Sequence, residues 1–424
     1  MKFPYRGPLG AVLLGASLGG FVPSLASADP APPFHDLLRQ AQSAPRLKAA
    51  EASLDQAEGL AQQARARPNP SFNLSVENFA GSGAYAGSES AETTAEIEQT
   101  IELGGKRGAR IEAGRAGLDV ARAKANQSQS DFAFDLAQAY AAAEAADIRL
   151  QLAKDSLALA QDDARVADAM VKAGKEADLR SVQARSGVEA ARADVDEAEA
   201  VRSAAFARLT AMVDSPVPFT AISDSLLSHA DRGEAIPPVD PLTSPAYLVA
   251  QAERNAVAKR VRVEQTRSAP DVTVSLGVRR LAADDSHALV GGVSVPFPIF
   301  DRNRGNIRSV QAELAAADQQ VNIARLDAQA DIQSAMATLQ AAFTRVQSAH
   351  DSEQAAREAY RLTRIGYEAG KLPLSEVLGA RRILAEARNQ TLKAREDRLR
   401  AEAELAHLRG IIPFGDPQVS GDKS

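Results

Sequence analysis

Histidine and cysteine are the residues from which metal and nucleophilic sites are most often built. This chain has five His residues and no Cys. No His stands in a metal-ligand spacing such as HExxH, no nucleophile motif is visible, and no thiolate site can form. The His residues are far apart in the sequence: His35, His229, His287, His350 and His407. We therefore expect no catalytic residues, no metal site and no cofactor, and we do not expect an enzyme.

Glycine-rich stretches could instead cradle phosphate, and two are present. Residues 81–87 read GSGAYAG, but they lack the strand–turn–helix context and the Lys of a P-loop. We expect them to form a loop. Residues 103–107, LGGKR, begin a long helical segment, and the Gly pair there is better explained by a bend between a strand and a helix.

Glutamates recur in two segments that alternate polar and apolar residues. In residues 70–78, Phe72, Leu74 and Val76 alternate with polar side chains, and residues 94–103 follow the same pattern. Alternation with a period of two predicts half-buried strands. The polar face requires water, and we predict that it lines an aqueous lumen. Its acidic residues are Glu77, Glu96, Glu98 and Glu102.

A second pair of alternating segments occurs later in the chain, so that strand pairs are predicted in 70–103 and 270–300. Strands of about ten residues with one polar face have the length and pattern of tilted transmembrane strands. The alternative is two ordinary hairpins packed on a soluble core. One face of the predicted fourth strand is formed by Leu289, Val293, Val295, Phe297 and Ile299.

Two long segments, 106–171 and 303–367, have helical character. In the second, apolar and small residues recur at alternating spacings of three and four from Ile307 onward, which is a coiled-coil pattern. At 1.5 Å per residue, each helix would be about 100 Å long. Helices of this length exceed any compact domain, so they are expected to form a rod or a tube.

The chain is an internal duplication. Ala173-Gly174-Lys175 recurs 196 residues later as Ala369-Gly370-Lys371, and each triplet is predicted to form the turn of a helical hairpin. The expected order in each repeat is a helix (33–66 and 243–267), a strand pair and a long hairpin. The repeats are placed at 29–213 and 243–412, with a linker of little regular structure at 214–242 and an irregular tail at 413–424.

The first 28 residues have the organisation of a cleaved signal peptide. Lys2 and Arg6 precede the apolar stretch 9–22, and Ala26-Ser27-Ala28 is a small-x-small cleavage site. The alternative is an uncleaved membrane anchor. The formal net charge of −6 argues against a nucleic-acid partner.

Any membrane span in the mature chain must be made of strands, because no later segment has about 18 consecutive apolar residues. Four strands cannot close a barrel, and open strand edges are not tolerated in lipid. Three protomers would supply twelve strands, an even number in the range known for outer-membrane barrels. We therefore expect a mixed α and β membrane protein, with four transmembrane strands per protomer.

The duplication, the two strand pairs and the paired Ala-Gly turns together resemble the outer membrane efflux protein family, of the TolC type. The residues VEN (76–78) and EQTIELGGKRGAR (98–110) further resemble its heavy-metal efflux branch, the CzcC-like proteins. The resemblance implies a homotrimer, with a twelve-stranded barrel in the outer membrane of a Gram-negative bacterium and a helical tunnel across the periplasm. It also implies two partners, a periplasmic adaptor (membrane fusion) protein and an inner-membrane pump of the resistance-nodulation-division type.

The resemblance further assigns roles to the hairpin turns. Contacts with the adaptor would involve Gly174, Lys175, Leu179, Gly370, Lys371, Leu374 and Ser375. A periplasmic aperture would involve Asp178, Arg180 and Glu376. A contact between Arg180 and Glu376 could hold the aperture closed; the alternative is that both are solvated surface charges.

The implied function is a passive trimeric duct that exports substrates, heavy-metal cations above all, from the pump. Two alternatives remain open at the level of the sequence. One is a soluble periplasmic coiled-coil scaffold or adaptor. The other is the outlet of a type I protein secretion or drug efflux system, which would share the same architecture.

Overall fold

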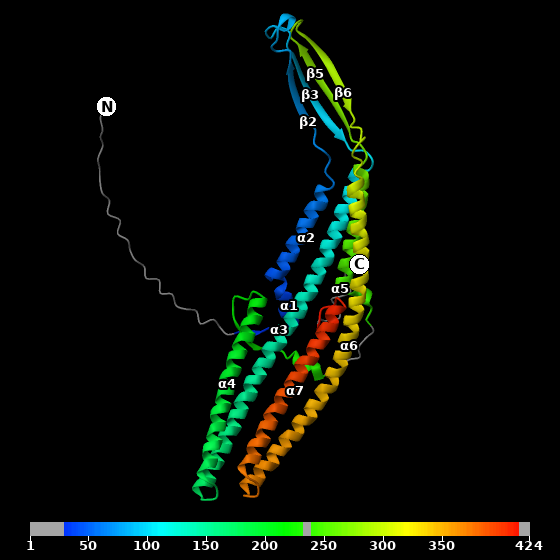
Figure 1. Ribbon diagram of the computed structural model, residues 1–424. Helices are drawn as coiled ribbons and strands as arrows, with labels where there is room; N and C mark the ends of the chain where they lie inside the picture. Colours follow the sequence, from blue (N-terminus) through cyan, green and yellow to red (C-terminus); the bar gives the residue numbers. More distant parts are fainter. Residues whose placement is uncertain (1–28, 232–238, 415–424) are drawn as a thin grey trace, which may run out of the picture.

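The computed structural model describes residues 29–231 and 239–414, and these form a long rod (Figure 1). A four-stranded sheet lies at one end, and the turns of two helical hairpins lie at the other. The predicted signal peptide, 1–28, and most of the predicted tail lie outside the described residues.

Two pairs of long helices build the rod. α3 (Lys106–Lys172) packs along α4 (Asp178–Met212), and α6 (Arg304–Glu368) packs along α7 (Leu374–Leu408). α3 has 67 residues and α6 has 65, which confirms the prediction of two very long helices. Coiled-coil positions of α6 are buried as the heptad predicts, among them Val310, Ala335, Leu339, Ala342 and Val346.

Shorter helices extend this bundle toward the sheet. α2 (Pro45–Gln63) lies along α3, and α5 (Pro245–Arg267) lies against both α3 and α6. The single helix expected at 33–66 is in fact divided into α1 (Phe34–Gln40), a 3-10 turn and α2. The break occurs at Ala44, which is extended because it precedes a proline. Pro45 then occupies the first turn of α2, where its missing N–H costs nothing.

The sheet combines strands from both repeats. Its order is β2 (Ser71–Glu77), β3 (Glu92–Ile101), β5 (Val272–Leu281) and β6 (Ser286–Ser294), and all neighbours are antiparallel. The β3–β5 pairing joins the first repeat to the second along ten residues of each strand. β2 and β6 are therefore the two edges of the sheet within the described protomer.

The fourth strand is shorter than the alternation predicts. β6 ends at Ser294, so Val295, Phe297 and Ile299 lie beyond it and do not extend its face within the protomer. Pro296 and Pro298 follow the strand. Because proline has no N–H to donate to a ladder, two prolines in three positions end regular pairing here.

The segment between the repeats is more ordered than the sequence predicts. β4 (Phe219–Ile222) pairs in parallel with β1 (Asp29–Ala31). The buried Glu144 of α3 then accepts hydrogen bonds from the backbone N–H groups of Leu226 and Leu227, at 2.9 and 3.0 Å. Glu144 is more than 80 residues away in the sequence from the N–H groups that it binds. No local sequence pattern reveals such a contact, so the composition of the segment alone indicated an irregular linker. No described helix is long and apolar enough to cross a membrane.

Candidate functional site

The two faces of the sheet have opposite chemistry. By register, Glu98 lies beside Ser71 and Ser275, and Glu96 lies beside Asn73 and Gly277, so these residues share one polar face. Glu77 pairs with Glu92 on the same face. The structure thus places Glu77, Glu96 and Glu98 on one face, as the alternation predicted. It adds Glu92, because β3 begins two residues before the predicted strand.

The other face of the sheet is apolar and exposed. Phe72 is 70% exposed, Leu276 is 68% exposed and Leu289 is 83% exposed. The outward face also carries Leu74, Val76, Ile97, Ile101, Val274, Val278 and Val293, all of them exposed. The helices in Figure 1 continue from the foot of the sheet and do not cover it. Exposure of so many neighbouring apolar side chains to water is unfavourable. A contiguous apolar patch of this kind therefore marks a contact surface.

Arg279 is the basic side chain that this polar face carries within the described strands. Its guanidinium forms ion pairs with Glu92 at 2.9 Å and with Glu77 at 3.6 Å. Its Nε also donates a hydrogen bond to Thr94 Oγ1 at 3.0 Å. The alternation in the sequence placed Arg279 on a polar face, but it was not predicted as a functional residue. Its proximity to two carboxylates of the first repeat depends on the register between strands, which the sequence does not reveal.

Glu102 does not belong to this face, which corrects its predicted position. β3 ends at Ile101, and the Glu102 carboxylate accepts hydrogen bonds from Arg110 of α3. Arg110 also donates to the carbonyl oxygen of Ala66 at 3.1 Å. Two adjacent glycines lie between Glu102 and the start of α3 in the sequence. Gly104 has a φ of 66° and Gly105 a φ of 77°, so the chain bends sharply from strand to helix. Glu102 therefore holds the junction between sheet and helix.

The two hairpin turns have the same backbone structure. Gly174 and Gly370 adopt φ of 69° and 71°, in the left-handed region. In the first turn, the N–H of Lys175 donates to the carbonyl of Met170, and the N–H of Gly174 donates to that of Val171. The second turn repeats both bonds from Lys371 and Gly370. This is the Schellman arrangement, and it explains why the Ala-Gly-Lys triplet occurs twice.

Most of the residues predicted at the tips are exposed there. Gly174, Lys175, Gly370, Lys371 and Ser375 are exposed, and Leu179 is 60% exposed. Leu374 is different, because it is 0% exposed and packs with Tyr367 and Val377 in the core near the tips. Leu374 is thus an internal residue of the second hairpin, and the prediction that it contacts an adaptor does not fit its burial.

The predicted aperture residues lie at the start of α4 and α7. Asp178 and Glu376 are exposed in the first turns of these helices, and both are acidic at the positive end of a helix dipole. Arg180 is half-buried and forms an ion pair with Glu176 at 3.7 Å. It also donates to Gln183 Oε1 at 3.0 Å. Within the described protomer, Arg180 therefore pairs along its own hairpin and not with Glu376.

A buried polar cluster joins the two hairpins above the tips. Asp163 of α3 is 3% exposed and accepts a hydrogen bond from the hydroxyl of Tyr360 at 3.1 Å. Its other oxygen pairs with Arg381 of α7 at 3.3 Å. Burial raises the pKa of the Asp163 carboxyl, and burial also raises the pKa of Tyr360 to about 12. None of the three was predicted, because their proximity depends on the packing of helices from different repeats.

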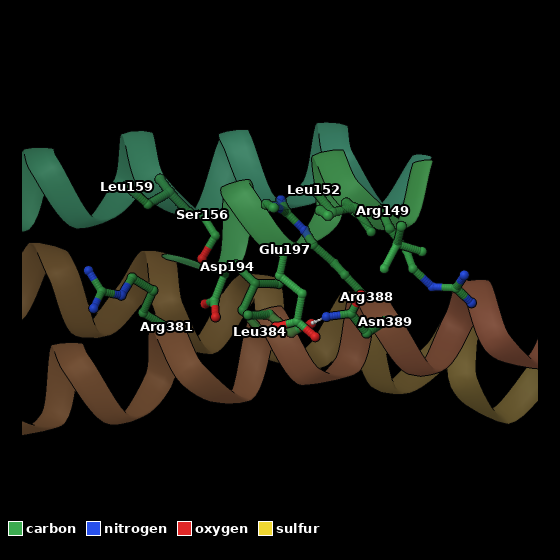
Figure 2. Close-up of a pocket in the computed structure, with 14 residues that line it drawn as sticks. Arg149, Leu152, Ser156, Leu159, Asp194, Glu197, Arg381, Leu384, Arg388 and Asn389 are labelled. Atoms are coloured by element: carbon green, nitrogen blue, oxygen red, sulfur yellow. Dashed lines mark hydrogen bonds between the residues drawn. The ribbon is translucent and has the colours of Figure 1, made fainter. Parts of the chain in front are cut away.

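A cleft of about 340 Å³ lies between α3, α4 and α7 beside this cluster (Figure 2). Its charged lining includes Arg149, Asp194, Glu197 and Arg388, and its apolar lining includes Leu152, Leu159 and Leu384. Glu197 and Arg388 point toward each other across it. In the described part of the chain, no three His, Cys, Asp or Glu residues are grouped so that they could hold a metal ion.

The exposed apolar sheet face, the polar face behind it and the long paired hairpins define a membrane channel with a helical extension. The chain belongs to the outer membrane efflux protein family, whose sequence pattern matches residues 37–214 and 242–410. This confirms the family that the duplication, the strand pairs and the hairpin turns predicted. Like other members of this family, it is an efflux protein of the outer membrane and not an enzyme.

Three heavy-metal resistance proteins are similar to this chain. It is 41% identical over 387 residues to the nickel-cobalt-cadmium resistance protein NccC of Alcaligenes xylosoxydans xylosoxydans, covering 91% of this chain and 88% of that protein. It is 42% identical over 317 residues to the nickel and cobalt resistance protein CnrC of Cupriavidus metallidurans, covering 74% and 75%. The cobalt-zinc-cadmium resistance protein CzcC of the same organism is 32% identical over 370 residues, covering 81% of each chain. The predicted resemblance to the CzcC-like branch is confirmed.

Solved channel structures share the fold. The channel CusC superposes with a TM-score of 0.77 at 17% identity, covering 89% of this chain and 92% of that one. The outer-membrane channel OprN superposes with a TM-score of 0.75 at 20% identity, covering 89% of both chains. The predicted architecture of strands and long helices is thereby confirmed.

Proposed function

We propose that this protein is the outer-membrane duct of a tripartite heavy-metal efflux system, and that it works as a homotrimer. The duct is passive: an inner-membrane pump of the resistance-nodulation-division type supplies the energy. A periplasmic adaptor connects the pump to the hairpin tips. One observation carries the proposal: the sheet has two open edges and an exposed apolar face.

Open edges favour assembly with further copies. β2 and β6 present unpaired backbone groups at the two sides of one sheet. Such edges are not tolerated in lipid, where each unsatisfied N–H or C=O costs several kcal/mol. Joining β6 of one protomer to β2 of the next satisfies both edges, and three protomers close a barrel of twelve strands. A closed barrel would place the exposed apolar face against lipid and the glutamates in the lumen.

The dimensions of the sheet fit an outer-membrane span. β3 and β5 have ten residues each, and a tilted transmembrane strand requires about 9–11 residues. At the end of the apolar face nearest the hairpin loops, Arg280 pairs in register with His287 and forms an ion pair with Asp285 at 2.9 Å. These polar groups support a membrane boundary at that level, with the loops outside.

The lumen chemistry supports the passage of cations without tight binding. On the polar face, Glu77, Glu92, Glu96 and Glu98 outnumber Arg279. A negatively charged wall raises the local concentration of cations. A duct should not hold its substrate strongly, since ions must leave as easily as they enter. The heavy-metal resistance relatives support metal cations as the substrate.

The hairpin tips are the proposed contact with the adaptor. Lys175 and Lys371 project from two structurally equivalent turns, which Gly174 and Gly370 permit. Leu179 and Ser375 are exposed at the start of the helices that follow. The acidic Asp178 and Glu376 begin the helices beside them. We keep these residues as the proposed tip surface and aperture and leave Leu374 out of the contact.

The test is the state of the protein in the outer membrane. Membranes from cells producing the full-length chain are extracted with detergent and run on SDS gels with and without boiling. The expected result is an outer-membrane band at trimer mass that collapses to the monomer on boiling. A monomer released with the soluble periplasm would overturn the proposal in favour of the scaffold alternative.

The substrate is tested separately from the assembly. A strain lacking this protein is challenged with Ni²⁺, Co²⁺, Cd²⁺, a panel of drugs and a secreted-protein reporter. The expected result is sensitivity to the metal ions alone, restored by the wild-type gene. Sensitivity to drugs alone would instead assign the duct to drug efflux. Loss of secretion of the reporter would assign it to type I secretion.

A further inference from the structure

We propose that Arg279 determines how strongly the outer end of the duct favours cations over anions. This inference deepens the proposed function and rests on it. Arg279 is half-buried and lies on the polar face of β5, two residues before the strand ends at Leu281. It is the basic side chain on a face whose other charged residues, within the described strands, are glutamates.

The contacts of Arg279 span three strands. It reaches Glu92 on β3 at 2.9 Å and Glu77 on β2 at 3.6 Å, and its Nε is held by Thr94 on β3 at 3.0 Å. Thr94 is itself buried. Three partners on neighbouring strands give the guanidinium a defined position. The planar guanidinium loses little conformational entropy for each hydrogen bond that it forms, which favours this arrangement. The positive charge is therefore fixed at one level of the wall.

The charges are consequently graded along the strand axis. The register rows of Glu98 (with Ser71 and Ser275) and of Glu96 (with Asn73 and Gly277) contain no basic side chain in the described sheet. These rows lie nearer the helices. The rows of Glu77 and Glu92 and of Arg279 lie nearer the loops, and there the guanidinium offsets the carboxylates. The two rows at the foot of the described wall therefore carry two uncompensated carboxylates per protomer, whereas the two rows nearest the loops carry a net of one negative charge, because Arg279 pairs with Glu77 and Glu92.

This gradient favours release at the exit. A cation leaving the tunnel first meets the Glu98 and Glu96 rows, which raise its local concentration. It then meets the row of Arg279 and, beyond it, the row of Glu77 and Glu92, where the guanidinium partly neutralises the carboxylates and so opposes retention. A conduction path requires attraction strong enough for entry and weak enough for exit. Arg279 is thus the specificity-determining residue of the outer end of the wall.

The absence of Cys from the chain permits a direct test. Ser75 lies in the same register row as Thr94 and Arg279, two strands from Arg279, or about 10 Å at the usual strand spacing. In the full-length protein carrying Ser75→Cys, the single thiol reacts with cationic or anionic methanethiosulfonate added outside intact cells. The ratio of the two reaction rates reports the local potential and does not depend on whether the periplasmic tips are open.

We expect Arg279→Gln to raise the ratio of cationic to anionic reaction rates about fivefold at low salt, and less at high salt, because three charges per trimer are removed from the lumen. The matched control is Arg280→Gln. It removes the same charge one residue away, on the opposite face, where Arg280 pairs with Asp285. The control should leave the ratio unchanged.

A second variant keeps the test decisive if Arg279→Gln does not assemble. Glu77→Gln with Glu92→Gln removes the carboxylates that Arg279 pairs with, so this double variant and the triple variant that adds Arg279→Gln differ only in the guanidinium, and the triple variant should show the higher ratio. Equal ratios for wild type and Arg279→Gln, or for the double and the triple variant, would overturn the role of Arg279 and leave the duct intact. If the thiol introduced by Ser75→Cys reacts with neither reagent in assembled trimers, the lumen assignment fails, and the proposed function fails with it.

Discussion

Tyr360 of α6 donates its hydroxyl hydrogen to Asp163 of α3 across 3.1 Å, and so joins residues 197 positions apart in the chain. Arg381 of α7 completes the contact from the other side of the carboxylate, at 3.3 Å. Gly187 of α4 leaves room for it, since a Cβ there would lie 3.0 Å from the Arg381 guanidinium. Side chains from α3, α6 and α7 thus meet at one buried charge, and α4 packs beside them.

Removing Arg381 should destabilise the hairpins strongly. Arg381→Met leaves the buried carboxylate of Asp163 without its cation, which costs about 3–5 kcal/mol. The exposed neighbour Arg382→Met is the matched control and should change stability by less than about 0.5 kcal/mol. Thermal unfolding of the detergent-solubilised protein, followed by circular dichroism, measures both. Equal melting temperatures for the two variants would contradict the structural role of the Asp163 contact.

The same variant should show a defined pH dependence. Burial already raises the folded-state pKa of Asp163 above its ordinary value, and loss of Arg381 raises it further. An acid with a raised folded pKa favours folding below its unfolded pKa, and this contribution is lost as pH rises through the folded pKa. The deficit of Arg381→Met relative to wild type should therefore be largest near pH 7 and should shrink toward pH 4. A deficit that grows on acidification would contradict this assignment.

The conformation of the turns makes Gly370 sensitive to substitution. Gly370→Ala places a Cβ on a residue with φ of 71° and should cost about 1–2 kcal/mol. Gly379→Ala is the internal control, because Gly379 lies inside α7 and has no neighbouring atom within 4 Å of the position that a Cβ would take. This control should stabilise the helix by about 0.5–1 kcal/mol. Opposite signs in the unfolding temperature are expected. Two stabilising substitutions would argue against the left-handed turn.

Two leucines near the tips should separate stability from transport. Leu374→Ala removes a fully buried side chain and should cost about 2–5 kcal/mol. Leu179→Ala changes an exposed residue and should leave the melting temperature unchanged while weakening metal resistance and adaptor cross-linking. The measurement pairs a melting curve with a resistance assay for each variant. Normal resistance and normal cross-linking in Leu179→Ala would remove Leu179 from the proposed contact.

Charge on the two sheet faces should have unequal effects. Leu276→Lys places a charge on the exposed apolar face and should cost about 2–4 kcal/mol in the bilayer. Ser275→Lys adds the same charge one residue away on the polar face and should be tolerated. The yield of heat-sensitive trimer in the outer membrane compares the two. Similar yields would contradict the assignment of the faces to lipid and lumen.

Local patterns in the sequence were sufficient for the long helices, the four strands of the sheet and the hairpin turns, but not for the β1–β4 pair. Alternation located the strands, a sustained heptad located α6, and Gly174 and Gly370 located the turns. These features depend on neighbours within a few residues, so they can be recognised without a partner. The boundaries were less accurate where prolines intervene, as at Pro45 and at Pro296.

The amino-acid sequence by itself thus determined the duplication, the long hairpins, the two-faced strands and the family. The tertiary structure alone decided which charges meet. It placed Arg279 of the second repeat beside Glu77 and Glu92 of the first, took Glu102 out of the polar face and buried Leu374 and Asp163. The physical reason is that periodicity is a local property of the chain, whereas register between distant strands and packing between distant helices are set by contacts that no short segment contains.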